Sequence, residues 1–153
     1  MKYWLMKSEP SVFGIDALAK MPRRRTSWDG VRNYQVRNMM RDEMKKGDLA
    51  FFYHSSCEVP GIYGIVKLVG EGHPDLTAFD ADHHHFDPKS DPADPTWYMV
   101  DVELVEKLKQ PITLEKLKPN ASKLDDLLIL KRGNRLSITP VTTQQWKKVL
   151  ALA

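Results

Sequence analysis

Hydrophobic and polar positions alternate along this chain in short segments, each bounded by proline, glycine or charged residues. Segments of this length that are rich in aromatic and β-branched residues are typical of β-strands. Six segments show the pattern: 3–7, 48–54, 62–69, 96–107, 127–131 and 136–139. The connection between the second and third is short enough for a hairpin.

Helical spacing is confined to four other segments. The predicted helices are a short one around 15–18, one over 33–46, one near 113–117 and one that begins after Thr142. Gly47 is expected to stop the second helix. Thr142 and Gln145 have the spacing of a capping box, in which each side chain bonds the backbone of the other residue. Strands mixed with short helices predict an α+β fold with a small, curved, mostly antiparallel sheet or barrel, and argue against a dinucleotide-binding βαβ array.

The chain is expected to form a single domain over residues 1–153, because its length falls in the usual range of one domain. Segment 71–95 carries four prolines and six aspartates and is predicted as a surface loop. The single cysteine, Cys57, excludes an internal disulfide. No apolar run reaches membrane-spanning length, and the N-terminus lacks a signal-peptide core. We therefore expect a soluble protein with no membrane partner, cytoplasmic or, in a eukaryote, nuclear.

Positive charge is concentrated near the N-terminus. The net charge is +3 and the sequence pI is about 8.9. Nine lysines and arginines lie within 20–46, whereas acidic residues are frequent over 71–106. This distribution favours an electropositive side that attracts an anionic partner. A solvent-exposed helix face with basic side chains and no partner gives the same pattern.

Residues that could support catalysis or bind a metal do not form a complete set. The segment 80–87 contains His83, His84 and His85, but adjacent histidines on an extended loop are not expected to converge on one ion, so no metal site is predicted. His54 and Cys57 could form a base and a nucleophile, yet no third group orients them. No glycine-rich phosphate loop is present. The sequence therefore predicts no catalytic residues and no cofactor.

Aromatic and amide side chains are more informative. Flat rings stack on a nucleobase while amide and hydroxyl groups read its hydrogen-bonding edge, as proteins do with extruded or single-stranded bases. The residues suited to this are Trp4, Trp28, Tyr34, Phe52, Tyr53 and Trp97 beside Ser8, Asn33, His54 and Ser55.

Several motifs together resemble the EVE-domain family over nearly the whole chain. They are 4–10 (WLMKSEP), 28–35 (WDGVRNYQ), 47–48 (GD) with 52–55 (FYHS), 60–62 (PGI), 87–90 (DPKS), 97–102 (WYMVDV), and 135–137 (RLS) with 140–141 (PV). The resemblance implies a PUA-like mixed β-barrel with flanking short helices, related to the YTH domains that read methylated adenine. It also implies non-catalytic binding of a modified base in nucleic acid, with modified cytosine in DNA favoured and a modified RNA base as the alternative.

The resemblance places a base-binding pocket between three of these motifs. Trp28 would be the main stacking wall, Asn33 would read the base edge, and Lys7 and Ser8 would form the floor. The remaining expected lining residues are Tyr34, Phe52, Tyr53, His54, Ser55 and Trp97. Because side chains alternate along a strand, either Tyr53 and Ser55 or Phe52 and His54 can face the pocket together, and the sequence does not choose between them.

Basic residues near the pocket are expected to position the nucleic acid through its phosphates, which carry no sequence information. These are Arg23, Arg24, Arg25 and Arg37. The chain departs from the family pattern at Ser56, Cys57, Thr139 and the triple histidine, which puts the preference of the pocket in doubt.

Two other functions fit the sequence. One is an enzyme acting on modified nucleotides, with His54 as general base and Asp29 or Glu9 as its acid partner. The other is a peptide-binding interaction module that uses the same groove. Oligomeric state does not follow from the sequence.

Overall fold

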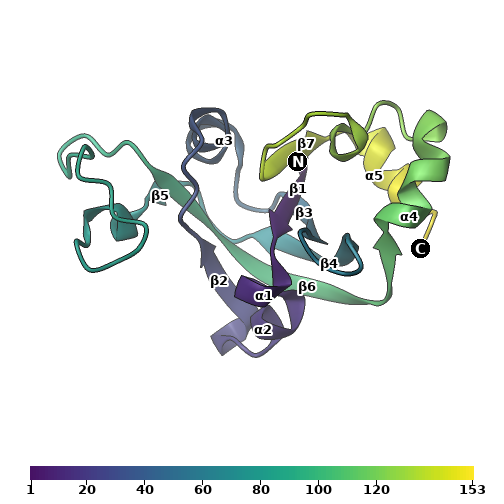
Figure 1. Cartoon of the computed structure of the whole chain (residues 1–153), viewed down its shortest axis with the longest axis horizontal. Coiled ribbons are helices and arrows are strands. Elements are labelled where there is room, and N and C mark those ends of the chain that lie inside the picture. Colours follow the sequence, from purple (N-terminus) through teal and green to yellow (C-terminus); the bar gives the residue numbers. More distant parts are fainter.

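The computed structural model describes all residues 1–153 and has a mixed α+β fold built on one strongly curved sheet (Figure 1). Its seven strands are β1 (Tyr3–Ser8), β2 (Arg25–Trp28), β3 (Leu49–His54), β4 (Gly61–Leu68), β5 (His73–Pro74), β6 (Tyr98–Thr113) and β7 (Ile138–Val141). The strand order is β2-β6-β4-β3-β1-β7, with β5 paired to β6. Only β1 and β3 are parallel.

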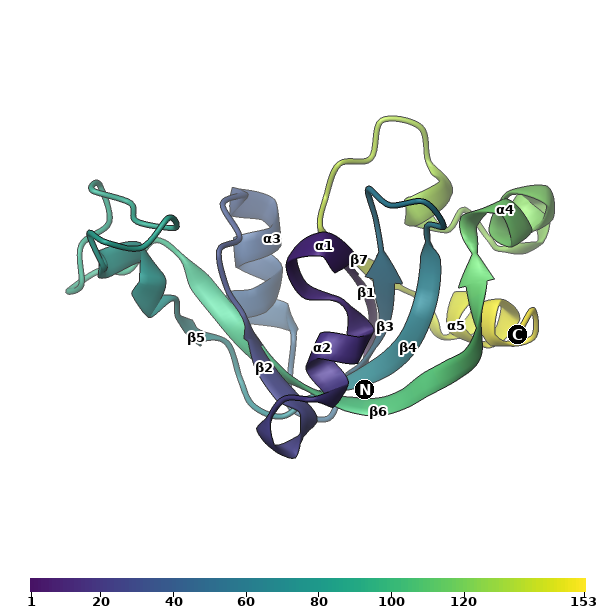
Figure 2. The ribbon, with the colours of Figure 1, turned by 60° about the horizontal axis from the view of Figure 1, so that its bottom comes forward.

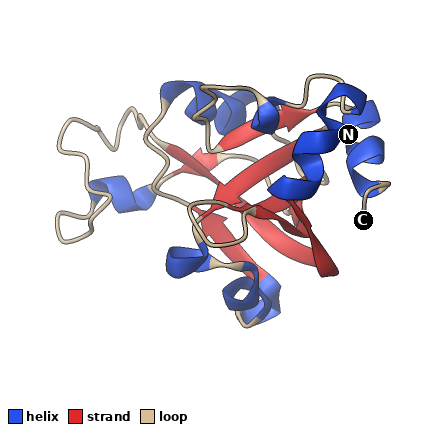
Figure 3. Cartoon of the chain, turned by 45° about the vertical axis from the view of Figure 1, so that its right-hand side comes forward, coloured by secondary structure: helices blue, strands red, loops and turns tan.

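The helices are short and lie around the sheet (Figure 3). They are α1 (Pro10–Phe13), α2 (Ile15–Ala19), α3 (Tyr34–Asn38), α4 (Leu114–Leu117) and α5 (Thr143–Leu150). A π-turn over Met39–Glu43 continues α3, and 3₁₀ turns occupy Pro22–Arg24, Leu76–Phe79, Lys118–Lys123 and Leu128–Leu130. None of these helices has the length and apolar character needed to cross a bilayer.

The prediction of an α+β fold with a mostly antiparallel sheet is confirmed, but the sheet does not close into a barrel. β2 and β7 lie at opposite ends of the strand order, and no ladder joins them. Both are only four residues long. Instead of a closing strand pair, α1 and α2 fill the concave side of the curved sheet (Figure 2). The open sheet with short helices is consistent with the PUA-like fold that the resemblance implies.

Both faces of the sheet are buried, because side chains alternate between two core clusters. On β3, Ala50 and Phe52 belong to the cluster that α2 and α3 cover, whereas Phe51 and Tyr53 belong to the cluster that α5 covers. The capping box of α5 is confirmed: the Thr142 hydroxyl accepts from the Gln145 backbone N–H at 3.1 Å, and the Gln145 side-chain oxygen accepts from the Thr142 N–H at 2.9 Å.

Four sequence-based predictions differ from the structure. Segment 127–131 contains a 3₁₀ turn rather than a strand, as a short apolar run cannot distinguish the two. β2 was not predicted because it is a polar edge strand, whose Ser27 hydroxyl bonds the Asp101 carboxylate across the ladder at 2.7 Å. β6 continues six residues beyond Lys107. The helix expected over 33–46 ends at Glu43, where Met44 turns to an extended conformation before Gly47.

Candidate functional site

A cavity of about 800 Å³ opens on the concave side of the sheet. Its walls come from the end of β1, from α1, from β2, from the segment 29–33 that leads into α3, and from the loop 83–85. Residues near the start of β7, Arg135 and Ser137, complete it. Small-molecule pockets in proteins typically measure about 300–1,000 Å³, so the cavity is large enough for one nucleobase with its sugar.

Four residues expected at the base-binding pocket line this cavity: Lys7, Ser8, Trp28 and Asn33. Trp28 is the only tryptophan among the lining residues. Its side chain is held from behind by Phe52, with ring centroids 5.5 Å apart and an interplanar angle of 82°. This edge contact fixes the indole while leaving it part of the cavity wall.

The Asn33 side-chain amide uses its oxygen within the fold, whereas its NH₂ group is free. Its Oδ1 accepts a hydrogen bond from the Val36 backbone N–H at 3.0 Å, which makes Asn33 the N-cap of α3. The Nδ2 group donates to no atom of the chain, and a primary amide carries two N–H donors. The roles of helix cap and base reader are therefore compatible, because they use opposite ends of one amide.

Lys7 and Ser8 bring polar groups to the floor of the cavity from the end of β1. Burial lowers the pKa of the Lys7 ammonium, and no carboxylate forms an ion pair with it. The Ser8 hydroxyl donates to the Phe13 carbonyl at 2.5 Å, so its oxygen remains able to accept. A half-buried ammonium without a partner gains hydrogen bonds from a ligand oxygen that enters the cavity.

The β3 residues expected on the opposite side do not line the cavity. Phe52 and His54 share the face of Trp28, but α1 and α2 cover them, and the neutral His54 Nε2 accepts from the Ile15 backbone N–H at 3.1 Å. The His54 ring stacks on Tyr63, and burial lowers the pKa of the His54 imidazole. Tyr53 points into the core on the other face of the sheet.

Ser55, Tyr34 and Trp97 also lie outside the cavity lining. Tyr34 is 61% exposed and packs on Trp97 with ring centroids 5.0 Å apart. The Arg37 guanidinium lies 5.1 Å from the centre of the Tyr34 ring, and that of Arg32 lies 5.3 Å from the Trp97 ring. These side chains form a cation–aromatic stack beside the cavity rather than a second wall inside it.

A buried carboxylate, Asp75, holds the wall segment 30–32 in place and was not expected from the sequence. Its side chain has no exposed surface. Its oxygens accept from the Gly30 N–H at 2.8 Å, from Arg32 at 3.2 Å, and from the Thr77 N–H and hydroxyl at 2.9 and 2.5 Å. Burial alone would raise the pKa of Asp75, but these hydrogen bonds together outweigh it and lower the pKa.

The histidine loop, residues 83–85, forms another part of the cavity wall. Residues 83–85 lie in a turn, so the expectation that they could not converge because the loop is extended is wrong: their ligating atoms all lie within 4.8 Å of one another. His85 packs directly on Gly30, where an added Cβ would come within 2.3 Å of the ring. Gly30 also has a φ of +74°, which favours glycine. Burial, first, and the neighbouring His84 lower the pKa of His85.

The cavity has fourteen other lining residues, none of which was among those expected, although several stand in the motifs of the EVE-domain resemblance. They are Glu9, Val12, Phe13, Thr26, Ser27, Asp29, Gly30, Val31, Arg32, His83, His84, His85, Arg135 and Ser137. For Asp29, Gly30 and Arg32, proximity to Trp28 and Asn33 in sequence was a usable signal. For residues 83–85 and Arg135, only the tertiary fold brings them to the cavity.

The four arginines expected to contact phosphates differ in whether their guanidinium groups are already bound within the chain. Arg23 and Arg24 are exposed, have φ values of 57° and 55°, and form no ion pair. Arg25 is bound to Glu103 at 3.1 Å. Arg37 donates to the Thr96 carbonyl at 2.8 Å. The first two therefore have the most freely available guanidinium groups.

The chain is similar to known proteins over nearly its whole length. Residues 2–152 match the family described as EVE domain. Human thymocyte nuclear protein 1 is 43% identical over 166 residues, which cover 98% of this chain and 73% of that protein. The crystal structure of human THYN1 protein in complex with 5-methylcytosine containing DNA has a TM-score of 0.92 at 42% identity, covering 99% of this chain and 97% of the other. A Pseudomonas putida crystal structure also has a TM-score of 0.92, at 45% identity and 98% coverage of both chains. The chain belongs to the EVE-domain family.

Proposed function

We propose that this protein binds a modified nucleobase of a nucleic acid in the cavity, without catalysis, and that 5-methylcytosine in DNA is its preferred ligand. The observation that carries the proposal is the joint presence on one cavity of a fixed indole, Trp28, a free amide donor on Asn33 and the half-buried ammonium of Lys7. The relative that was solved with 5-methylcytosine containing DNA supports the same ligand.

In this arrangement the base stacks on Trp28, and the two nitrogen donors meet its edge. A cytosine presents two acceptors, N3 and O2, which match the Asn33 amide and the Lys7 ammonium. A buried acceptor without a donor would be penalised by about 1–3 kcal/mol, so the pair of donors gives the site selectivity for the base edge. A modified RNA base with the same acceptors is the alternative ligand.

The enzyme alternative is disfavoured by the position of His54. A general base must reach the proton that it removes, but the His54 Nε2 is occupied by the Ile15 N–H and the ring lies outside the cavity. The peptide alternative is disfavoured because most lining residues are polar or charged.

We also infer that residues 1–153 form one domain with a PUA-like fold, since both core clusters are built on one sheet. The name of the vertebrate relatives supports a nuclear location if this chain is eukaryotic.

The experiment that tests the proposal is a tryptophan-fluorescence titration with oligonucleotides that differ at one base. The set contains cytosine, 5-methylcytosine, 5-hydroxymethylcytosine, adenine or N6-methyladenine, in DNA and in RNA, at two salt concentrations. Tighter binding of 5-methylcytosine DNA than of its unmodified twin supports the proposal. Equal, weak and salt-insensitive responses to every oligonucleotide contradict it.

Asn33 offers a test of base-edge reading that leaves the helix cap intact. Both Asn33→Asp and Asn33→Ser keep an oxygen that accepts from Val36 N–H, but neither keeps the amide donor. We expect each variant to bind the modified oligonucleotide about 10- to 100-fold more weakly, because a base acceptor is left unpaired. Thermal denaturation should show little change in Tm. Wild-type affinity in both variants would mean that Asn33 only caps α3.

Arg23 and Arg24 are expected to contribute to the salt dependence of binding. Each phosphate contact adds about −0.9 to the slope of log K against log salt concentration for duplex DNA. The double variant Arg23→Asn and Arg24→Asn should therefore reduce the steepness of the slope by about 2, and asparagine tolerates the positive φ of both positions. Arg25→Gln is the matched comparison and should change the slope less, since Glu103 already binds this guanidinium. An unchanged slope in the double variant would place the phosphates elsewhere.

A further inference from the structure

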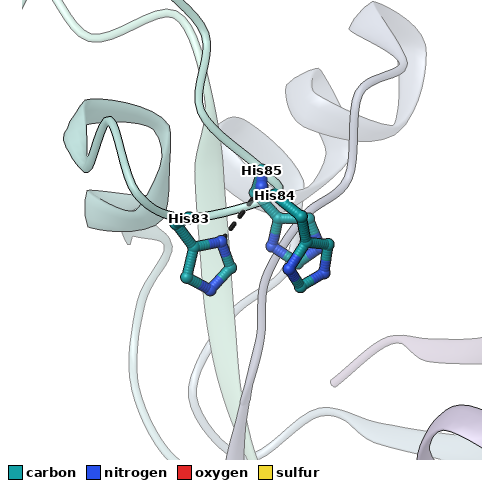
Figure 4. Close-up of side chains that lie close together, drawn as sticks. All are labelled: His83, His84 and His85. Atoms are coloured by element: carbon teal, nitrogen blue, oxygen red, sulfur yellow. Dashed lines mark hydrogen bonds between the residues drawn. The ribbon is translucent and has the colours of Figure 1, made fainter.

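His83, His84 and His85 gather their imidazole rings on the cavity side of one turn (Figure 4). The ring centroids of His83 and His84 are 4.6 Å apart, and those of His84 and His85 are 4.0 Å apart. Each residue offers one ring nitrogen as a ligand atom, and the three nitrogens lie within 4.8 Å of one another. Zinc–imidazole bonds measure about 2.0–2.1 Å, so ligand nitrogens around one ion lie about 3–4 Å apart. Small rotations of the rings would bring the three into range.

His85 is already oriented as metal-bound histidines usually are. Its Nδ1 lies 3.4 Å from the Thr77 hydroxyl oxygen. That hydroxyl donates a hydrogen bond to the Asp75 carboxylate, so its oxygen is the acceptor for a hydrogen bond from His85 Nδ1–H. This chain of contacts places the Nδ1–H toward Thr77 and leaves Nε2 as the nitrogen with a free lone pair. A histidine that donates its other ring N–H to a fixed acceptor is the usual second layer of a metal site.

The backbone of the turn is fixed as well. Arg32 donates to the His85 carbonyl at 2.6 Å, and Gly30 packs against the His85 ring. His83 is the less prepared ligand, because its Nδ1 accepts from the His85 backbone N–H at 3.0 Å. Binding through His83 requires this hydrogen bond to be exchanged, which weakens the site relative to one whose three ligands are all free.

We propose that His83, His84 and His85 bind a divalent transition-metal ion of the zinc type at the wall of the cavity. Imidazole nitrogens suit zinc, nickel and copper, whereas magnesium and calcium prefer oxygen ligands. Three protein ligands leave at least one coordination position for water or an anionic group on the cavity side. The metal site does not depend on the identity of the base that the cavity binds.

The test is isothermal titration of the full-length, tag-free protein with Zn²⁺, using Mg²⁺ as the negative ion. We expect one equivalent of Zn²⁺ and no Mg²⁺ binding. His84→Ala and His85→Ala should each weaken binding by at least about tenfold. His73→Ala is the matched control, since His73 lies outside the loop 83–85 and pairs with Asp101, and it should bind Zn²⁺ as the wild type does.

Thr77→Val distinguishes a built site from adventitious binding by exposed histidines. This substitution keeps the three imidazoles and the shape of residue 77, but it removes the acceptor for His85 Nδ1–H. Loss of such an outer partner typically lowers metal affinity about 10- to 100-fold, and we expect a loss in this range. Circular dichroism checks that each variant is folded. Zn²⁺ binding that is unaffected by Thr77→Val and falls only in proportion to the number of histidines would mean an adventitious ion only and would overturn the proposal.

Discussion

Replacing Trp28 by alanine is expected to reduce affinity for the modified oligonucleotide by about 5- to 150-fold, because stacking of one base on an aromatic side chain contributes about 1–3 kcal/mol. The selectivity between 5-methylcytosine and cytosine should fall with it, since the base then loses the surface that fixes its plane. Trp28→Phe keeps an aromatic face and should retain a larger part of both quantities. Binding is measured by fluorescence anisotropy of a labelled oligonucleotide, which does not depend on the tryptophan signal.

A matched control separates stacking from destabilisation. Trp28 is 9% exposed and belongs to the core, so its truncation also lowers the free energy of unfolding. Phe52 packs on the edge of the Trp28 ring but does not line the cavity. Phe52→Leu should therefore lose stability while binding with nearly wild-type affinity. If Phe52→Leu and Trp28→Ala lost affinity equally, the effect would come from the core and not from stacking.

The elements of the fold could be predicted wherever a local pattern carried the signal. The alternation over 48–54 and 62–69 predicted β3 and β4, and the Thr142–Gln145 spacing predicted the start of α5. Edge strand β2 was missed because its polar residues face solvent and pair across the ladder with Asp101 and Glu103. Burial, which gives a strand its alternation, is weak at the edge of a sheet.

The residues of the candidate site could also be predicted only in part from local motifs. Lys7, Ser8, Trp28 and Asn33, which line the cavity, could be named in advance because each stands in a motif of the EVE-domain resemblance. His54 stands in an equally recognisable motif, but α1 and α2 separate it from the cavity. Sequence patterns show which residues share a face of a strand, yet they do not show which helix will cover that face.

The contribution of Asp75 is another feature that only the tertiary structure supplies. Asp75 lies in a loop rich in aspartate, and nothing in its neighbourhood distinguishes it from Asp80 or Asp82. Its role comes from Gly30 and Arg32, more than 40 residues away in sequence, which bring two donors to one buried carboxylate. The same carboxylate holds Thr77, which orients His85. Asp75 thus connects both walls of the cavity.

Asp75→Asn is expected to lower the free energy of unfolding at pH 7 by about 3–5 kcal/mol, the range found when one partner of a buried ion pair is removed. Each oxygen of the carboxylate accepts two hydrogen bonds, from Thr77 on one side and from Gly30 and Arg32 on the other. An amide has only one oxygen, so its NH₂ group must face two donors. Asp126→Asn is the control, because this carboxylate is 85% exposed and its pair with Lys131 should contribute about 0–1 kcal/mol.

The difference in stability between wild type and Asp75→Asn should depend on pH in one direction. The folded-state pKa of Asp75 is lowered, so the carboxylate stabilises the fold above its unfolded pKa of about 3.9, and this contribution is lost as the pH falls through the lower folded-state pKa. Urea denaturation at several pH values should therefore show a constant difference between pH 5 and 8. Below about pH 4 the wild type should lose stability faster than the variant, and the two curves should approach each other. A difference that stayed constant down to pH 2 would show that the charge of Asp75 does not stabilise the cavity wall.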